Sequence, residues 1–374
     1  MKKSLLAAAL IVGFAGAAQA QSTSVTLYGV VDGGIGYTQF KDGNGNKGTN
    51  TGFLDGGQSS NRWGLRGSED LGGGLSAIFT LESGFSLGTG QQSQGGRLFG
   101  REAFVGLKSS EWGQLTFGRQ GTIGHQWLSG IVSPFGNNFG QARASGAFSA
   151  AEARYDNQVQ YQTPSFSGFQ FGVGYSFNTS GNQAFKQAGQ GEPNTRAWTT
   201  GLRYVSGPVA AILAYDQVKD RSNVGGTGLT VKSWSLAGSY NFDVATLHLG
   251  VGRIENGWLD TNSFLNGNGK GGPAPIARWN DQFRAYTYTV GLSAPLGERN
   301  KIMGSWSMVD PTKKGLAYAG AATKLKSQHI FGLGFTHDLS KRTNLYVMGS
   351  YVDDLALQPG AKSYTVGAGV RHRF

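Results

Sequence analysis

The chain has 374 residues and no cysteine, with 33 basic against 22 acidic side chains, 62 glycines and nine prolines. Its composition is not that of a disordered protein, because 12% of its residues are aromatic. It is not that of collagen either, because the glycines do not recur at every third residue. Without cysteine it cannot form disulfides, and no segment after the first twenty residues has the roughly eighteen consecutive apolar residues of a transmembrane helix. These properties favour an all-β protein that tolerates much glycine.

Residues 1–20 have the pattern of a secretory signal peptide. Two lysines precede an apolar run from Leu5 to Ala15, and Ala18-Gln19-Ala20 forms a small-residue cleavage site. The alternative, a membrane anchor, is disfavoured because the run is too short to span a bilayer. We expect cleavage before Gln21, which leaves residues 21–374 as a single barrel domain. Loss of the two lysines would leave it with a formal charge of +9.

Apolar and small polar residues alternate along most of the remaining chain. In residues 169–178, FQFGVGYSFN, large apolar side chains take one parity, whereas glycine, glutamine and serine take the other. Residues 154–163, 198–205 and 285–292 alternate in the same way. A period of two predicts β-strands with one apolar and one polar face.

The connections between these strands alternate in length. Seven tight turns are expected, among them EDLGGG, VSGP and DLSKRTN. Eight long polar segments lie between them, near 38–60, 86–98, 121–153, 178–196, 219–231, 255–282, 310–327 and 353–361. Seven turns and eight loops join sixteen strands, an even number that is typical of bacterial outer-membrane barrels. A soluble propeller, the alternative, requires a motif repeated in each blade, and no such repeat is found.

The last twelve residues, SYTVGAGVRHRF, are also patterned as a strand that ends on Phe374. Val366, Val370 and Phe374 share the apolar parity, whereas Arg371 and Arg373 share the polar one. We expect this strand to close the barrel by pairing with the first strand near residues 25–31. Closure leaves no unpaired sheet edge, so it supplies stability without disulfides.

Several long motifs, in order along the chain, resemble the general porins of Gram-negative outer membranes, in particular the β-proteobacterial type. They include SVTLYGVVDGGI, NRWGLRGSEDLGGGLSAIFTLESGF, LFGREAFVGLKSSEWGQLTFGRQ and the final VGAGVRHRF. The resemblance implies a homotrimer of sixteen-stranded barrels in the outer membrane, passing small hydrophilic solutes and ions. It implies contacts with lipids and lipopolysaccharide, and recognition of Phe374 by the barrel assembly machinery.

The resemblance also implies that the third long loop, residues 121–153, folds into the barrel and forms its constriction. Ser133, Pro134, Phe135 and Gly136 stand where many relatives have Pro-Glu-Phe-Gly, so the usual carboxylate is missing. The loop otherwise carries Arg143, and its one acidic residue, Glu152, lies close to its end.

A basic barrel wall opposite this loop is the second element that the resemblance implies. Arg62, Arg119 and Arg154 match its positions. Alternation directs Arg62 and Arg66 into the lumen, and it does the same for Arg154 if Tyr155 points outward. Alternation alone would direct Arg119 outward, so only the resemblance favours it, and Arg101 is a weaker candidate for the same reason. The alternative role for any of these arginines is a rim residue that binds lipopolysaccharide phosphates.

Acidic residues expected in the lumen are few. Glu82, Asp156 and Asp216 lie on predicted strands, and the third loop adds only Glu152. Channels select ions by pore diameter and by the charges that line the pore. We therefore expect a weak to moderate preference for anions that declines as salt screens the lumen.

Other classes of function fit the sequence less well. The five histidines fall on five different elements, away from any recognisable serine-nucleophile motif, so an outer-membrane enzyme is disfavoured. No cofactor or metal site is indicated, and no basic helix suggests nucleic-acid binding. A substrate-specific channel, or a surface adhesin on the same barrel, remains the alternative to a general diffusion porin.

Overall fold

The computed structural model describes residues 23–222, 225–259, 279–312 and 324–374. The predicted signal peptide lies outside these residues. The strands are β1 Thr23–Lys41, β2 Lys47–Asp55, β3 Arg62–Gly72, β4 Leu75–Gly84, β5 Glu102–Ser109, β6 Gly113–Gly121, β7 Arg154–Gln162, β8 Phe169–Ser176, β9 Arg196–Ser206, β10 Val209–Lys219, β11 Thr230–Asn241, β12 Thr246–Glu255, β13 Arg284–Leu296, β14 Asn300–Pro311, β15 Gln328–Asp338, β16 Thr343–Asp353 and β17 Lys362–Arg373. Short helices are α2 Ile123–Trp127, α3 Ser129–Val132, η2 Gly140–Ala142, η3 Ala144–Gly146, η4 Ser149–Glu152 and η5 Leu355–Leu357.

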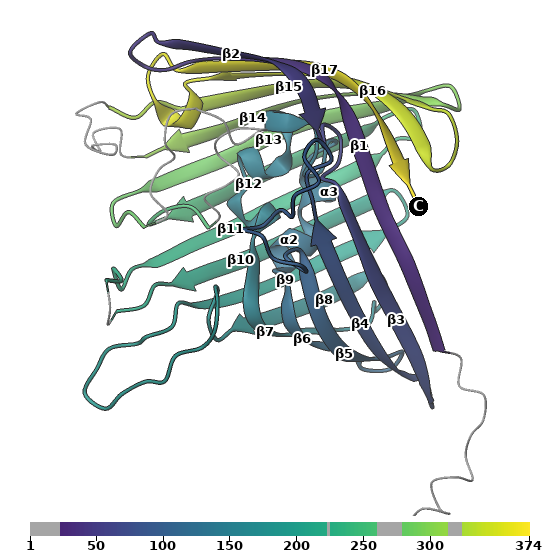
Figure 1. The fold of residues 1–374 in the computed structure, drawn as a ribbon, viewed down its shortest axis with the longest axis vertical. Helices are drawn as coiled ribbons and strands as arrows, with labels where there is room; N and C mark the ends of the chain where they lie inside the picture. Colours follow the sequence, from purple (N-terminus) through teal and green to yellow (C-terminus); the bar gives the residue numbers. More distant parts are fainter. Residues whose placement is uncertain (1–22, 223–224, 260–278, 313–323) are drawn as a thin grey trace, which may run out of the picture.

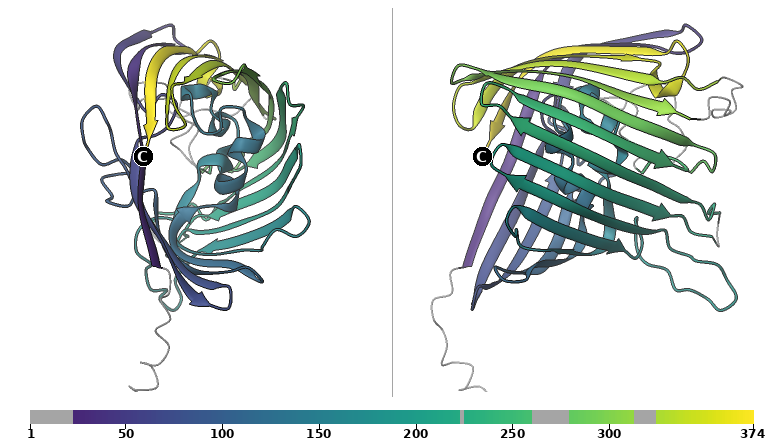
Figure 2. Two further views of the ribbon diagram at one scale, coloured as in Figure 1. Left: turned by 90° about the vertical axis from the view of Figure 1, so that its right-hand side faces the viewer. Right: turned by 180° about the vertical axis from the view of Figure 1, so that it is seen from behind.

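The strands form one closed antiparallel barrel (Figures 1 and 2). From β3 to β17 each strand pairs with the next, and β17 pairs with β1 to close the ring. β2 and β3 lie end to end along the same side of β1, so together they make one strand of the wall. The predicted sixteen-stranded barrel is confirmed.

The first expected loop was wrong in its extent. Residues 38–60 were expected to be a long loop, but β1 continues to Lys41 and β2 occupies Lys47–Asp55. The reason is that the second strand is rich in glycine, threonine and asparagine, so its alternation is weak. Residues 56–61 interrupt the wall strand that β2 and β3 form. These six residues lie opposite only two residues of β1, because Asp55 pairs with Gly33 and Arg62 pairs with Val30.

The two faces of the barrel differ as the alternation predicts. Outward side chains of the strands are apolar and exposed, for example Phe169 (50%), Leu202 (48%) and Leu213 (51%). Inward side chains such as Gln160 and Ser235 are polar and buried. All seven predicted short turns lie at one end of the barrel, where the last residue also lies. Among the described residues, no helix is long and apolar enough to cross a membrane.

The chain end closes the barrel in the expected register. Phe374 and Gly29 exchange backbone hydrogen bonds of 3.0 and 3.1 Å, and Val30 pairs with Arg373 beside them. The Phe374 ring covers Gly29, where an added Cβ would lie 2.3 Å from the ring. A larger residue at position 29 would therefore displace the terminal ring.

The third loop, residues 122–153, folds into the barrel and carries five of the six short helices found in the described residues (Figure 2). Its apolar side chains make an internal core with the inner wall, including Ile123, Leu128, Val132 and Phe148. Because the protein interior is closely packed, the loop comes nearest to the wall where the wall side chains are small.

Glycines supply that space on five strands. A Cβ would lie 2.6 Å from Ile123 at Gly172, 2.4 Å from Val132 at Gly250, and 2.4 Å from Pro134 at Gly291. Gly201 and Gly332 face Ile123 and Ala142 in the same way. Some of the many glycines thus allow the third loop to pack closely against the inner wall.

Candidate channel constriction

The first half of the third loop is anchored over Asp216. Thr122 caps α2 by accepting a hydrogen bond from the backbone of His125, and the Ile123 amide donates to the Thr199 hydroxyl at 2.8 Å. The hydroxyls of Thr122 and Thr199 face the carboxyl of Asp216, which is fully buried beneath α2. Asp216 is therefore on the inner face, as expected, but the loop separates it from the pore.

The Ser133–Gly136 motif forms a turn that packs against β14–β16. The Ser133 hydroxyl accepts a hydrogen bond from the Phe135 amide, and Gly136 has a positive φ of 56°. Phe135 and Phe139 meet edge to face with centroids 5.3 Å apart, within an apolar cluster completed by Leu54, Ala142, Met303, Tyr346 and Met348. The motif lacks the usual carboxylate and holds its place by apolar packing.

Residues 56–61, the interruption between β2 and β3, hold the tip of this loop. The Phe139 amide donates to the carbonyl of Gly57 at 3.1 Å. The interruption is in turn bound by Asp32 of β1, whose carboxylate accepts hydrogen bonds from the amides of Gln58 and Ser59 and from the Tyr346 hydroxyl. Asp32 is fully buried, and its carboxylate anchors the middle of this segment.

One charged cluster gathers on the inner wall around Glu82. Arg101 forms a hydrogen-bonded ion pair with Glu82, and Arg62 lies 3.7 Å from the same carboxylate. The Tyr28 hydroxyl also donates to Glu82, at 3.0 Å, and Arg66 stacks over the Tyr28 ring at 5.3 Å. The structure thus brings together Arg62, Arg66, Arg101 and Glu82.

Arg154 and the end of the third loop complete this cluster. Arg154 interacts electrostatically with Arg101, Glu82, Glu102 and Glu152. Arg143 and Glu152, both on the loop, are 3.5 Å apart. Although burial opposes it, the charge of Arg143 keeps the pKa of Glu152 below its usual value, so the loop carboxylate is ionised. We name Arg62, Arg101, Arg143, Arg154, Glu82, Glu102 and Glu152 the constriction cluster.

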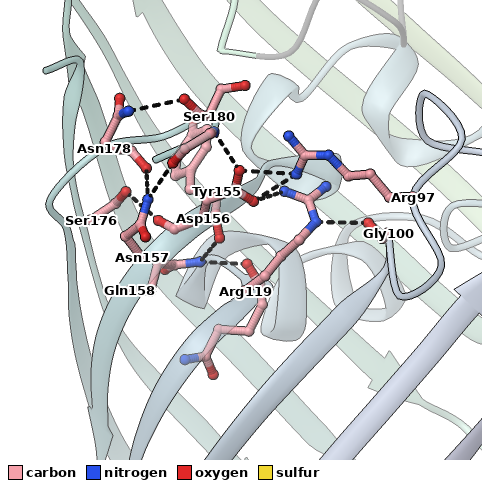
Figure 3. A network of polar contacts seen from close by, with 12 residues as sticks. Arg97, Gly100, Arg119, Tyr155, Asp156, Asn157, Gln158, Ser176, Asn178 and Ser180 are labelled. Carbon is pink, nitrogen blue, oxygen red and sulfur yellow. Dashed lines mark hydrogen bonds and ion pairs between the residues drawn. The ribbon is translucent and has the colours of Figure 1, made fainter. Parts of the chain in front are cut away.

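Arg119 and Asp156 belong to a separate network (Figure 3). The Arg119 guanidinium donates to the carbonyl of Gly100 and to Asp156 at 2.6 Å, and Arg97 binds the same carboxylate at 2.8 Å. Arg119 has the parity of Phe117, whose side chain is 46% exposed on the outer face. The structure therefore does not bring Arg119 or Asp156 into the constriction cluster.

The expected outward orientation of Tyr155 was wrong. Its side chain is 4% exposed and belongs to the internal core. The register of β6 and β7 shifts between Gly118 and Gln120, and Asn157 adopts a positive φ of 51°. This irregularity interrupts the alternation at the start of β7, so Tyr155 turns inward while Arg154 still reaches the constriction cluster.

His125 makes the third loop sensitive to acid. Its Nδ1 donates to the Ala151 carbonyl at 2.7 Å, and burial, reinforced by the charge of Arg154, holds its pKa well below the usual value. The folded state therefore keeps His125 neutral, whereas the unfolded chain protonates it below about pH 6.5. The free energy of unfolding is therefore unaffected by His125 above that pH. As the pH falls further, it decreases by at most about 1.4 kcal/mol per pH unit.

We expect the thermal stability of the barrel in detergent to decline between pH 7 and pH 5, and the decline to be smaller in a His125→Gln variant. His372→Gln, at an exposed outer position, is the matched control and should decline like the unaltered protein. An equal decline in both variants would assign the acid sensitivity to other groups.

Two elements of the site escaped the sequence analysis. Glu102 pairs in register with Glu82, a relation between neighbouring strands that alternation within one strand does not reveal. Asp32 is the lone charged residue in an otherwise apolar and glycine-rich run, VVDGGIG, and this isolation was an available signal. In the part of the chain that the structure describes, no group of three or more histidines and carboxylates is placed to hold a metal ion.

A closed barrel with an apolar exterior, a polar interior and a charged loop folded inside is an outer-membrane channel of the porin class. The Gram-negative porin family model matches residues 7–356, and the chain belongs to this family. An outer membrane porin protein of Bordetella pertussis is 48% identical over the whole of both chains. Outer membrane porin protein 32 of Delftia acidovorans is 32% identical, also over the whole of both chains.

Solved structures agree with this assignment. An anion-selective porin from Comamonas acidovorans is 28% identical and has a TM-score of 0.69, covering 94% of this chain and 100% of that one. The trimer form of an outer membrane protein of Vibrio cholerae shares the fold at 14% identity, with a TM-score of 0.61 over 94% and 100% of the two chains. This protein is an outer-membrane general diffusion porin, and its fold is that of a channel rather than an enzyme.

Proposed function

We propose that this porin prefers anions. The observation that carries the proposal is the constriction cluster, in which four arginines oppose three glutamates. Two of the arginines share one carboxylate, Glu82, so their charge is only partly neutralised. The similarity to a porin named as anion-selective supports the same assignment.

Zero-current potentials across planar bilayers under a potassium chloride gradient test this preference. We expect the sign of an anion-selective channel, and a selectivity that declines above about 1 M salt, where the Debye length is about 3 Å. A potential of the cation-selective sign would contradict the proposal.

The double variant Arg62→Ala, Arg154→Ala tests where the preference arises. It removes two positive charges from the constriction cluster, so the zero-current potential should move toward, or past, zero. Arg119→Ala is the matched control, because its guanidinium belongs to the separate network with Asp156. If the double variant and the control behave alike, selectivity does not arise at the constriction cluster.

We further propose that the protein is a homotrimer without catalytic activity, embedded among outer-membrane lipids and lipopolysaccharide. The porin resemblance supports this assembly. Phe374, in its exposed position at the barrel seam, is the proposed signature for the assembly machinery. Chemical crosslinking of the purified porin should give a trimer, and removal of Phe374 should lower the yield of folded barrel in the outer membrane.

A further inference from the structure

A second charged region lies between the third loop and the end of the barrel that carries the short turns. A cavity of about 440 Å³ is bounded on one side by Ser133–Gly136 and Asn138 of the loop, and on the other by β14–β17 and the turn between β15 and β16. In outer-membrane barrels the short turns face the periplasm. We name this cavity the periplasmic vestibule.

The vestibule is strongly basic. Its lining includes Lys301, Lys341, Arg342, Arg371 and Arg373, and the one carboxylate that lines it is Asp338. It is therefore more basic than the constriction cluster, where arginines and glutamates nearly balance.

The vestibule cations differ from Arg62, Arg101 and Arg143, each of which makes a close ion pair with a glutamate. In residues 23–222, 225–259, 279–312 and 324–374, no ion pair within 4.0 Å involves any of its five basic side chains. Arg371 is held instead by neutral groups, the Asn344 amide oxygen at 2.9 Å and the Ser59 hydroxyl at 3.0 Å. Its position is thus defined by neutral groups, whereas the carboxylates of Asp32 and Asp338 act on its charge without a close ion pair.

The size and the donors of the cavity indicate the kind of solute. A water molecule occupies about 30 Å³ of liquid, so a volume of about 440 Å³ admits a solute of several heavy atoms with part of its hydration. Lysine and arginine donors that converge from three elements suit an anion with several charged oxygens. A monovalent ion would engage few of them.

We propose that the periplasmic vestibule is a binding site for small polyvalent oxyanions, separate from the constriction cluster. It extends the proposed anion preference but does not depend on it, since the vestibule and the constriction carry different residues. Because the site lies on one side of the third loop, solute added from the periplasmic side reaches it without crossing the constriction. Binding should therefore be asymmetric.

Single-channel block by pyrophosphate tests this proposal. The protein contains no cysteine, so a Phe185→Cys background provides one thiol on a side chain that is 97% exposed, and a thiol reagent added to one side reports the orientation of the channel. Pyrophosphate should block from the short-turn side at a concentration about tenfold lower than from the long-loop side. Acetate at equal ionic strength, and sucrose, should show no such asymmetry.

Two triple variants locate the site. Lys301→Gln with Lys341→Gln and Arg342→Gln should abolish the asymmetry. The charge-conserving set, Lys301→Arg with Lys341→Arg and Arg342→Lys, should retain it and serves as the control for folding. Symmetric or absent block in the unaltered channel, or equal block in both triple variants, would overturn the proposal.

The zero-current potential, measured in the same membranes, separates the two proposals. An anion-selective channel with symmetric block refutes the vestibule site and leaves the anion preference standing. A cation-selective channel with asymmetric block refutes the anion preference and leaves the vestibule site standing.

Discussion

Replacing both Gly250 and Gly291 with alanine is expected to lower single-channel conductance and to destabilise the barrel by about 1–3 kcal/mol. An added Cβ at Gly250 meets Val132, and one at Gly291 meets the Pro134 ring, each at 2.4 Å. The third loop is tied to the wall at both ends, so the added methyl groups push α3 and the following turn toward the pore axis. Planar-bilayer recording and thermal unfolding in detergent measure the two effects.

Gly52→Ala is the matched control for this pair. Gly52 lies on the inner parity of β2, with Leu54, and an added Cβ there meets nothing within 4 Å. At a strand position with space for a Cβ, replacing glycine with alanine restricts the unfolded chain, so its effect on the stability of the fold is neutral or mildly favourable. Unchanged conductance in the double variant would show that the loop does not rest on these glycines.

Replacing Asp32 with alanine is expected to destabilise the barrel by about 3 kcal/mol, because three buried donors lose their shared acceptor. The donors are the amides of Gln58 and Ser59 and the hydroxyl of Tyr346. Residues 56–61 would then no longer fix the carbonyl of Gly57 beneath Phe139. We therefore also expect open-channel current noise to increase as the tip of the third loop loosens.

Unfolding in detergent, together with noise analysis of single channels, checks this result. Asp70→Ala is the control, since Asp70 is an exposed residue beside a short turn whose carboxylate accepts a hydrogen bond from the nearby Gly72 amide. Asp32→Asn keeps the size of the side chain and one acceptor oxygen, so its effect should be intermediate. A stable, quiet Asp32→Ala channel would show that the tip of the third loop is held by its apolar contacts alone.

The third loop is held by different forces along its length. Polar anchors hold its beginning at Thr199 and its tip at Gly57, whereas aromatic packing holds the Ser133–Gly136 turn. Glu152 is the carboxylate through which the loop meets the constriction cluster, and Arg143 partly neutralises it.

The fold could be predicted because a membrane barrel separates two solvents. Each strand must present apolar residues to lipid and polar ones to the lumen, so alternation directly reports the face of residues such as Phe169 and Gln160. The alternation of short turns and long loops then gives the number of strands. Prediction failed where that constraint is weak, in the polar β2, and where the backbone departs from regular pleating, at Asn157.

The sequence by itself determined the barrel, its strand number and the closing strand that ends at Phe374, whereas the loop that enters the lumen was implied by the resemblance to porins. Only the tertiary structure decided which charges meet: that Arg119 binds Asp156 apart from the constriction, that Glu82 is shared by Arg62 and Arg101, and that Asp216 is covered by α2. The physical reason is the distance along the chain over which each property is decided. Which face a strand residue takes follows from its immediate neighbours and the surrounding solvent, whereas ion pairs depend on the register between strands and on how a long loop packs.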